Sequence, residues 1–221
     1  MSAFGRPRWN SNEEGLSKEL LTAVVGGASI WEVKALLDKG AGLNARDSFG
    51  FTPLIAACQK GNEEVAKLIM DRCTNTALSE VEGDGGSPLL YACSHPCLAE
   101  VAATLIKRGA HVGAQDRYGE TALLNASRHD ALAPVAKALV AKGAPVNVRS
   151  AHTGATPLLY ACTRGDVELA MLLLDKFANV NVTALDGETP LLAAAGAGGT
   201  GDRCMAGVVA ALLQRGAAPN V

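Results

Sequence analysis

Cysteine and histidine side chains come nearest, in type and spacing, to forming a site for chemistry in this chain. Cys93, His95 and Cys97 lie close together in the sequence, and thiolate and imidazole are groups that bind zinc. A structural zinc site needs four ligands at characteristic spacings, however, and no second pair lies nearby in the sequence. The pattern therefore predicts no metal site and no other cofactor.

Motifs for catalysis or phosphate binding are absent from the sequence. Glycine-rich residues 83–86 and 196–201 lack the GKS/T or GxGxxG pattern that a phosphate-binding loop requires, so we interpret them as turns. Neither Gly-x-Ser-x-Gly nor His-Glu-x-x-His occurs. With no nucleophile placed beside a base, the sequence predicts no catalytic residues and a protein that is not an enzyme.

Charge and hydropathy exclude two further classes of partner. The net charge is −2 and the isoelectric point is about 6.1, so no global attraction to nucleic acid or to anionic lipid is expected. No apolar run approaches the roughly 20 residues that span a bilayer. The N-terminus lacks the apolar segment of a secretory signal. These features favour a reducing, cytoplasmic location.

The elements that would position any site come from an internal repeat. A tetrapeptide that begins with Thr or Ser and carries Leu at its third position recurs with spacings of 35, 34, 35 and 33 residues, starting at Thr52, Ser87, Thr121, Thr156 and Thr189. A fixed period in this range, with turn residues before each copy, indicates a linear stack of similar helical units. Each unit buries its apolar face against its neighbours, which favours binding over catalysis.

Each unit follows one pattern. A turn containing Gly precedes the Thr or Ser, which can cap a helix by accepting backbone N–H groups, and Pro often follows in the first helical turn. Gly61 and Gly165 end the first helix in two units. A second helix with i, i+3, i+4 apolar spacing then ends at Gly-Ala, as at Gly143. Asn follows in several units, where its amide could bond to the backbone: Asn44, Asn147, Asn181 and Asn220.

Three cysteines occupy one position of this repeat. Cys58, Cys93 and Cys162 each follow the alanine of a first helix. Cysteine serves there as a small apolar packing residue. Free thiols also suit the reducing compartment inferred above.

Together the turn, Thr-Pro-Leu, the alanine, the Val/Leu helix, Gly-Ala and Asn resemble the ankyrin repeat. The resemblance implies an all-α solenoid of helix-turn-helix repeats with β-hairpin-like connecting loops. It implies a flexible leader over residues 1–15 and one ankyrin-repeat domain over 16–221, with repeats at about 16–46, 47–81, 82–115, 116–150, 151–183 and 184–221. The first repeat lacks Thr-Pro-Leu, as a capping repeat would, and the last carries the glycine-rich insertion.

The family's usual binding surface is a concave face formed by the hairpin tips and the ends of the first helices. Aromatic residues and Arg are the commonest interface hot spots. Mapped by motif, the partner-binding candidates are Phe49, Phe51, Arg117, Tyr118, Arg128, His129 and Arg164. Lys60, Arg128 and Arg164 fall at matching places, and a basic strip there would suit an acidic or phosphorylated peptide.

These observations favour a non-catalytic scaffold that binds a partner protein or peptide on the concave face. One alternative is the targeting or regulatory region of a larger protein, since the apolar last helix around Val208 and Leu212 lacks the polar outer face of a terminal repeat. That helix predicts further residues after Val221, or self-association through an uncapped last repeat. An alternative of another class is a metal- or ligand-sensing domain built on His95, His129 and the cysteines.

Overall fold

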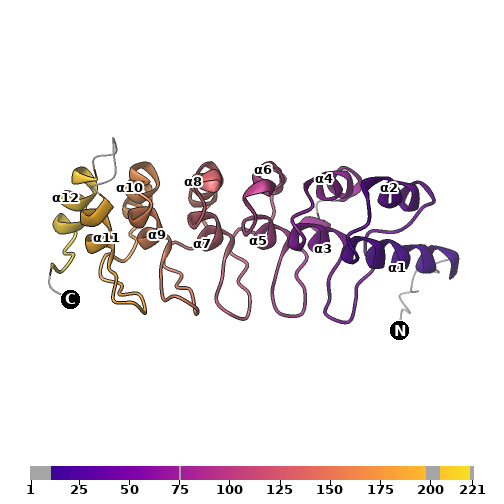
Figure 1. Cartoon of the computed structure of the whole chain (residues 1–221), viewed down its shortest axis with the longest axis horizontal. Helices are drawn as coiled ribbons and strands as arrows, with labels where there is room; N and C mark the ends of the chain where they lie inside the picture. Colours follow the sequence, from indigo (N-terminus) through magenta and orange to yellow (C-terminus); the bar gives the residue numbers. More distant parts are fainter. Residues whose placement is uncertain (1–10, 75, 198–204, 220–221) are drawn as a thin grey trace, which may run out of the picture.

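In the part of the chain that the structure describes, six pairs of antiparallel helices form the stack. The computed structural model describes residues 11–74, 76–197 and 205–219. The first helices of the pairs make an inner row, and the second helices make an outer row beside it (Figure 1). The inner row is α1 (Ser11–Val25), α3 (Pro53–Gln59), α5 (Pro88–Ala92), α7 (Ala122–Ser127), α9 (Pro157–Thr163) and α11 (Pro190–Ala197). The outer row is α2 (Ile30–Asp38), α4 (Glu63–Arg72), α6 (Ala99–Lys107), α8 (Ala133–Ala141), α10 (Val167–Asp175) and α12 (Ala206–Gln214).

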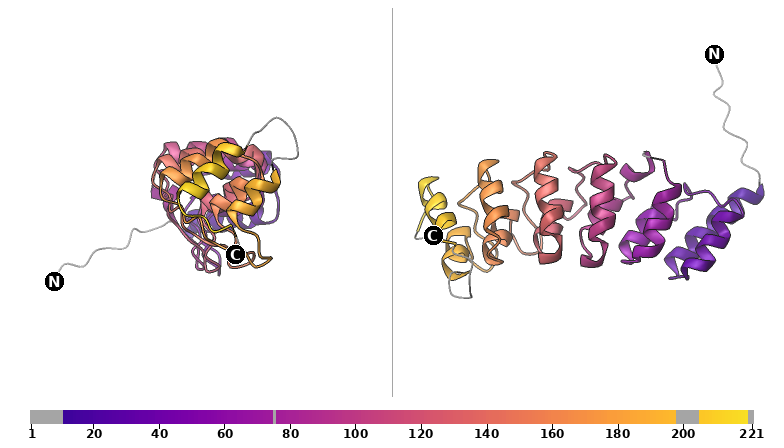
Figure 2. Two further views of the ribbon diagram at one scale, coloured as in Figure 1. Left: turned by 90° about the vertical axis from the view of Figure 1, so that its left-hand side faces the viewer. Right: turned by 90° about the horizontal axis from the view of Figure 1, so that it is seen from above.

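Loops shaped like hairpins project from the inner row to one side of the stack (Figures 1 and 2). Within the described residues no strand forms, and one isolated antiparallel bridge joins Gln115 to Thr121. Short 3₁₀ segments occur at Thr76–Ser79, Pro96–Leu98 and Asp130–Leu132. The all-α solenoid predicted from the repeat is confirmed.

Helix starts follow the capping logic read from the tetrapeptide. The Thr156 hydroxyl accepts the backbone N–H of Leu159 at 3.3 Å, and Thr121 does the same for Leu124 at 3.2 Å. Thr52, Ser87 and Thr189 cap their helices in the same way. These polar residues are nearly fully buried, so the cap also satisfies groups that water cannot reach.

Helix ends in the outer row show two departures from the Gly-Ala pattern, after α10 and after α4. Gly143 at the end of α8 has φ +83°, the left-handed conformation that glycine adopts without steric cost. Phe177 takes the same place after α10 with φ +60°, the one non-glycine residue with positive φ in the described chain. After α4, where Gly-Ala is missing, Arg108 of the next repeat donates to the carbonyls of Met70 (2.6 Å) and Cys73 (2.7 Å).

The predicted end of the N-terminal leader, at residue 15, is wrong. Helix α1 begins at Ser11, so residues 11–15 are helical and belong to the first repeat. The reason is packing: Leu20, Leu21 and Val24 of this helix are buried, and α1 lies against α3. Residues 1–10 of the leader, residues 198–204 of the glycine-rich insertion and Asn220 lie outside the described residues.

Packing between repeats supplies the core. Each inner helix contacts the next inner helix, and each outer helix contacts the next outer helix. Leu123 on α7 and Leu158 on α9 are fully buried, as are the repeated cysteines Cys58, Cys93 and Cys162. In the described part of the chain no helix is long and apolar enough to cross a membrane.

Candidate partner-binding face

The hairpin tips and the ends of the inner helices make up one surface, here called the hairpin face. Two of the tips, at residues 47–51 and 116–120, are each held by an aspartate that accepts two backbone N–H groups. Asp47 Oδ1 accepts those of Phe49 and Phe51, both at 2.9 Å. Asp116 Oδ1 accepts those of Tyr118 and Glu120, also at 2.9 Å. The side chains presented by the tips are therefore held on a defined backbone.

Neighbouring hairpins are also bonded edge to edge. Gly83 N–H donates to the carbonyl of Phe49 at 2.9 Å, and Arg117 N–H donates to that of Asp84 at 2.8 Å. This close approach requires glycine at position 85, where φ is +88° and an added Cβ would lie 2.5 Å from the Gln115 carbonyl oxygen. The tips thus form a continuous row along the stack.

Two predicted contact residues project into solvent from this row. Phe49 is 70% exposed and Tyr118 is 42% exposed. The Tyr118 ring lies 5.1 Å from the His152 ring of the next hairpin, and the Arg117 guanidinium lies 4.6 Å above it. Arg117 also pairs with Asp84 at 2.8 Å. Tyr118 is therefore an exposed aromatic held in place on two sides.

Phe51 lies deeper on the hairpin face. It is half-buried, and its ring lies 5.9 Å from that of Tyr91 on α5. Burial and the neighbouring carboxylate of Glu82 raise the pKa of Tyr91 to about 12, so this phenol stays neutral. The two rings therefore pack together between the hairpin at residues 47–51 and the hairpin at residues 82–86.

Arg128 lies in an internal polar network. Its guanidinium pairs with the nearly buried Glu120 carboxylate at 2.9 Å. It also donates to Asn125 Oδ1 at 3.0 Å, to the Tyr160 hydroxyl at 3.1 Å and to Ser150 Oγ at 3.1 Å. These five residues, the Glu120–Arg128 network, join α7 to the following hairpin and to α9. The guanidinium braces neighbouring repeats, since its donors point to protein acceptors.

Arg164 and His129 lie next to this network. Arg164 donates from Nε to Asp130 Oδ1 at 2.7 Å and from Nη1 to the Ser127 carbonyl at 2.7 Å, and its side chain is only 14% exposed. Burial lowers the pKa of His129, and Arg128 and Arg164 lower it further. Because both arginines are paired with carboxylates, the strip expected to be basic is largely neutralised.

The cysteine and histidine cluster does not assemble a metal site in the part of the chain that the structure describes. There, no three His, Cys, Asp or Glu side chains converge. One ring nitrogen of His95 bonds to the Gln59 carbonyl at 2.9 Å, and Cys97 donates to the Gly61 carbonyl at 3.5 Å. Both side chains thus hold the third repeat against the second.

Burial makes the repeated thiols poor acids. It raises the pKa of Cys58 and that of Cys162 from 9.0 to about 12. Below pH 9 these thiols are neutral in both the folded and the unfolded chain. Between pH 9 and 12 only the unfolded chain loses their protons, so the free energy of unfolding falls as pH rises.

We expect Cys58→Ala/Cys162→Ala to lose less stability at alkaline pH than the parent. Between pH 8 and pH 10 the free energy of unfolding of the parent should fall by about 1 kcal/mol more per thiol than that of the variant, because each pKa unit is worth about 1.4 kcal/mol. Urea unfolding at both pH values measures it. Equal losses in both proteins would show that these thiols ionise as easily in the folded chain as in the unfolded one.

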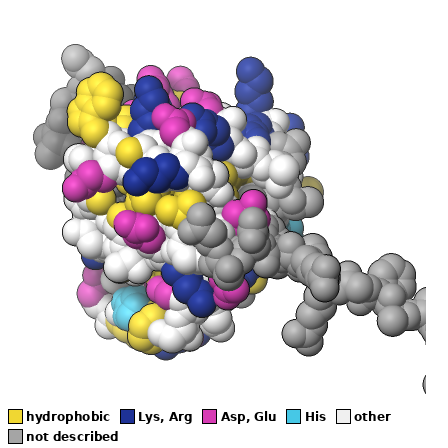
Figure 3. Space-filling model, turned by 90° about the vertical axis from the view of Figure 1, so that its right-hand side faces the viewer, with side chains coloured by type: hydrophobic (Ala, Val, Ile, Leu, Met, Phe, Trp, Pro, Cys, Tyr) yellow, Lys and Arg dark blue, Asp and Glu magenta, His cyan; other side chains and the backbone are white. Residues whose placement is uncertain are grey.

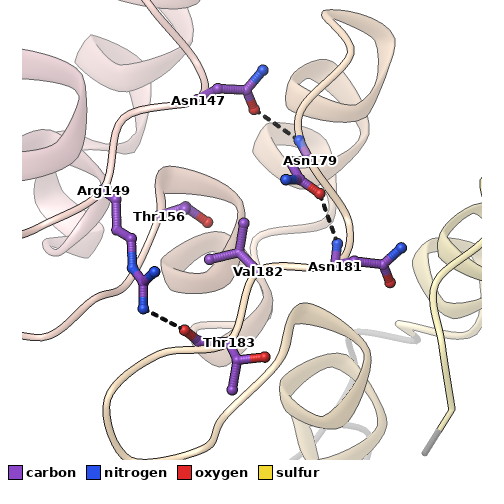
Figure 4. A pocket seen from close by; sticks show the side chains of 7 residues that line it. All are labelled: Asn147, Arg149, Thr156, Asn179, Asn181, Val182 and Thr183. Carbon is purple, nitrogen blue, oxygen red and sulfur yellow. Dashed lines mark hydrogen bonds between the residues drawn. The ribbon is translucent and has the colours of Figure 1, made fainter. Parts of the chain in front are cut away.

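Polar side chains also line a hollow on the fourth and fifth repeats, among them Asn147, Asn179 and Asn181 (Figure 4). Asn147 Oδ1 accepts the backbone N–H of Asn179 at 2.8 Å, and Asn181 Nδ2 donates to the Gly216 carbonyl at 3.0 Å. The sequence predicts such amide-to-backbone bonds. They are confirmed for Asn147 and Asn181, where they join one repeat to the next, so the hollow is part of the framework.

The burial of Glu120 and the exposure of Phe177 were not predicted from the sequence. Glu120 is 5% exposed although it lies in a hairpin, and its spacing of eight residues from Arg128 is the signal in the sequence for their ion pair. Phe177 is 88% exposed and has a positive φ, a backbone conformation that bulky residues such as Phe rarely adopt. Its signal was Phe-Ala where other repeats carry Gly-Ala.

A linear stack of helix pairs with a continuous hairpin face is the architecture of a helical-repeat interaction module. The sequence profile described as "Ankyrin repeats (3 copies)" matches residues 20–116 and 123–221, most of the chain. The chain belongs to the ankyrin-repeat family. Ankyrin repeats are a protein–protein interaction module.

Solved and curated proteins agree with this assignment. A crystal structure of an ankyrin repeat domain from Acinetobacter baumannii superimposes with a TM-score of 0.64 at 27% identity, covering 90% of this chain and 98% of that one. The probable 26S proteasome regulatory subunit p28 of Saccharomyces cerevisiae is 30% identical over 131 residues, 59% of this chain and 57% of p28. The chain therefore spans little more than half the length of that relative.

Two longer relatives share the repeats. Human rabankyrin-5 is 28% identical over 210 residues, which are 85% of this chain and 14% of rabankyrin-5. The putative E3 ubiquitin-protein ligase XBAT34 of Arabidopsis thaliana is 40% identical over 109 residues, 49% of this chain and 27% of XBAT34.

Proposed function

We propose that this protein is a non-catalytic scaffold that binds a partner protein or peptide on the hairpin face, the concave face of the ankyrin stack. The observation that carries the proposal is the row of bonded hairpins that presents Phe49 and Tyr118 to solvent. Exposed aromatic side chains on a rigid backbone lose little conformational entropy on binding, which makes them effective anchors.

The predicted contact residues divide into two groups on this proposal. Phe49, Tyr118 and Arg117 contact the partner, with Phe51 beside them. Arg128 and Arg164 support the face from within, because their guanidinium groups are already bonded to protein carboxylates and carbonyls. His129 is near both, and burial and then the charges of Arg128 and Arg164 lower its pKa. A partner that needs a free basic strip fits this surface poorly.

A reducing, intracellular setting also belongs to the proposal. Cys58, Cys73, Cys93, Cys97 and Cys162 are all free thiols in the structure. Such thiols persist where glutathione and thioredoxin keep cysteine reduced.

The proposal is tested by partner capture with matched variants. Phe49→Ser/Tyr118→Ser removes two exposed aromatics from the hairpin face. Trp31→Ser/Phe177→Ser removes two exposed aromatics that lie elsewhere, since Trp31 on α2 is 75% exposed and Phe177 is 88% exposed. Proteins captured from the native cell extract are identified by quantitative mass spectrometry, and the affinity of each variant is then measured with the purified partner by calorimetry.

We expect the Phe49/Tyr118 variant to bind at least about tenfold more weakly, the effect of losing a hot-spot side chain. The Trp31/Phe177 variant should bind like the parent. The reverse pattern would place the partner away from the hairpin face, and equal affinity in all three proteins would exclude aromatic anchors as the basis of binding.

A second candidate is a targeting or regulatory repeat region within a larger assembly. The observation that favours it comes from the relatives: in rabankyrin-5 and XBAT34 the matching segments occupy 14% and 27% of the chain. Similar repeats therefore serve there within longer proteins. Sequencing the full transcript tests this candidate, and an open reading frame that encodes only these repeats would exclude it.

A further inference from the structure

The row of hairpins carries a negative charge that the chain as a whole does not. Five hairpins make up this row: residues 47–51, 82–86, 116–120, 150–155 and 184–188. They contain seven acidic residues and one basic residue, Arg117, so their net charge is −6, against −2 for the whole chain. A surface with one sign of charge attracts a partner of the opposite sign and repels a partner of its own sign. The charge of the row therefore bears on what the hairpin face binds.

Basic side chains near the hairpins do not cancel this charge. Arg128 is bonded within its own network. At the hairpin bases, Arg46 pairs with Glu80 at 3.1 Å, and Arg149 donates to two backbone carbonyls. Counting these three arginines and the exposed Lys60 still leaves more acidic than basic residues. Figure 3 looks along the stack from its N-terminal end, and hydrophobic side chains lie beside acidic ones at the lower end, where the hairpins project.

One guanidinium group is already held between two hairpins. Arg117 Nη1 lies 2.8 Å from Oδ2 of Asp84 on the preceding hairpin. The same guanidinium lies 4.6 Å above the ring of Tyr118. A carboxylate and an aromatic face together suit a guanidinium, because the planar cation stacks on the ring while its N–H groups donate to the carboxylate. The hairpin row is therefore able to hold an arginine side chain.

The neighbouring junction presents an aromatic ring and the same carboxylate without a cation. Phe49 is 70% exposed at the tip of the second repeat. Asp84 lies on the next hairpin, where the N–H of Gly83 donates to the Phe49 carbonyl at 2.9 Å. The positions equivalent to Arg117 are Ser48 and Gly83 in these two hairpins, and a Cβ added at Gly83 would lie 3.1 Å from the Phe49 carbonyl oxygen. Neither hairpin thus supplies a cation of its own from this position.

Asp84 has the capacity to accept a second cation. Its side chain is half exposed, and its pair with Arg117 uses Oδ2. Each carboxylate oxygen accepts more than one donor, and among the described residues no donor is bonded to Oδ1. Asp47 and Glu82 on the same two hairpins accept backbone N–H groups. Neither is paired with a basic side chain in the part of the chain that the structure describes, so both add to the attraction for a cation.

We propose that the partner of the hairpin face is a basic protein segment that places an arginine side chain between Phe49 and Asp84. The inference rests on the proposed function, because it names the chemistry of the partner for that same face. The guanidinium stacks on the exposed ring and donates to Asp84 Oδ1. Further basic residues of the segment follow the acidic row, and an apolar residue contacts Tyr118. An acidic or phosphorylated segment is repelled by the charge of the row.

Peptide binding measured by fluorescence anisotropy tests the proposal. The probe is a short labelled peptide in which Arg alternates with Leu, and its counterpart has Glu in place of every Arg. We expect the parent protein to bind the Arg peptide at least about tenfold more tightly than the Glu peptide. The affinity for the Arg peptide should fall as salt concentration rises. Equal binding of the two peptides, or no binding of the Arg peptide, would overturn the proposal.

Matched variants locate the site. Asp84→Asn removes one charge at almost unchanged size, and Phe49→Ser removes the ring. Each should weaken binding of the Arg peptide at least about fivefold. Asp71→Asn makes the same change of charge at an exposed residue of the outer helix α4 and should bind the peptide like the parent. Equal losses for Asp84→Asn and Asp71→Asn would indicate attraction to the overall charge and would exclude the arginine site.

The native partner separates this inference from the function on which it rests. If Phe49→Ser/Tyr118→Ser weakens binding of that partner and Asp84→Asn does not, the scaffold function stands and the arginine site is wrong. If Asp84→Asn weakens binding of the Arg peptide but the Phe49/Tyr118 variant binds the native partner like the parent, the proposed function is wrong. The inference then fails with it.

Discussion

Leu158→Ala is expected to lower the free energy of unfolding by about 3 kcal/mol, within the range of roughly 2–5 kcal/mol measured for buried leucines. Leu158 is fully buried on α9, an inner helix that contacts α7, α10 and α11. The truncation leaves a cavity in the middle of the stack. Because each repeat is stabilised through its neighbours, the loss should be felt across adjacent repeats. Urea unfolding followed by circular dichroism measures it.

The control is Leu185→Ala, which removes the same atoms from a side chain that is 70% exposed. We expect that change to stay within about 0.5 kcal/mol of the parent, as for surface substitutions in general. A loss near zero for Leu158→Ala as well would contradict the register of the repeats.

Arg128→Ala is expected to cost about 2–3 kcal/mol, because it leaves the nearly buried Glu120 carboxylate without its positive partner. The value lies below that for a fully buried pair, since the guanidinium is partly exposed. The substitution also removes the bonds from Arg128 to Asn125, Ser150 and Tyr160. Thermal and urea unfolding both report this change, and helicity at low temperature should stay that of the parent.

Arg117→Ala provides the comparison, because the ion pair of Arg117 with Asp84 is exposed on both sides. Exposed pairs of this kind contribute little, so no measurable loss of stability is expected. If Arg128→Ala were equally harmless and instead reduced affinity for the partner, Arg128 would be a contact residue, and its assignment to the internal network would be wrong.

The repeat architecture was predictable because its signals are local. A Thr hydroxyl caps the N–H group three residues on, proline suits the first helical turn, and glycine ends a helix in the left-handed conformation. Periodic burial of Val and Leu then fixes which side of each helix faces its neighbours. All of these signals recur every 33–35 residues, which is why fold and family could be read before the structure.

The assignment of binding residues was only partly predictable. Motif position placed Phe49 and Tyr118 on hairpin tips, and both are exposed there. The same reasoning also predicted Arg128 and Arg164 as partner-binding residues. In the structure their guanidinium groups pair with Glu120 and Asp130. The start of α1 was also missed, since polar residues 11–15 carry no repeat motif and become helical as the N-terminal extension of a packed helix.

The sequence by itself determined the number of repeats, their caps and turns, and the burial of Leu123, Leu158 and the repeated cysteines, because hydrogen bonding within a turn and helical periodicity act over a few residues. Only the tertiary structure decided that Phe177 lies exposed with positive φ and that Arg128 braces the stack. The bracing depends on side chains some 30 residues apart in sequence, and local pattern does not fix which of them meet.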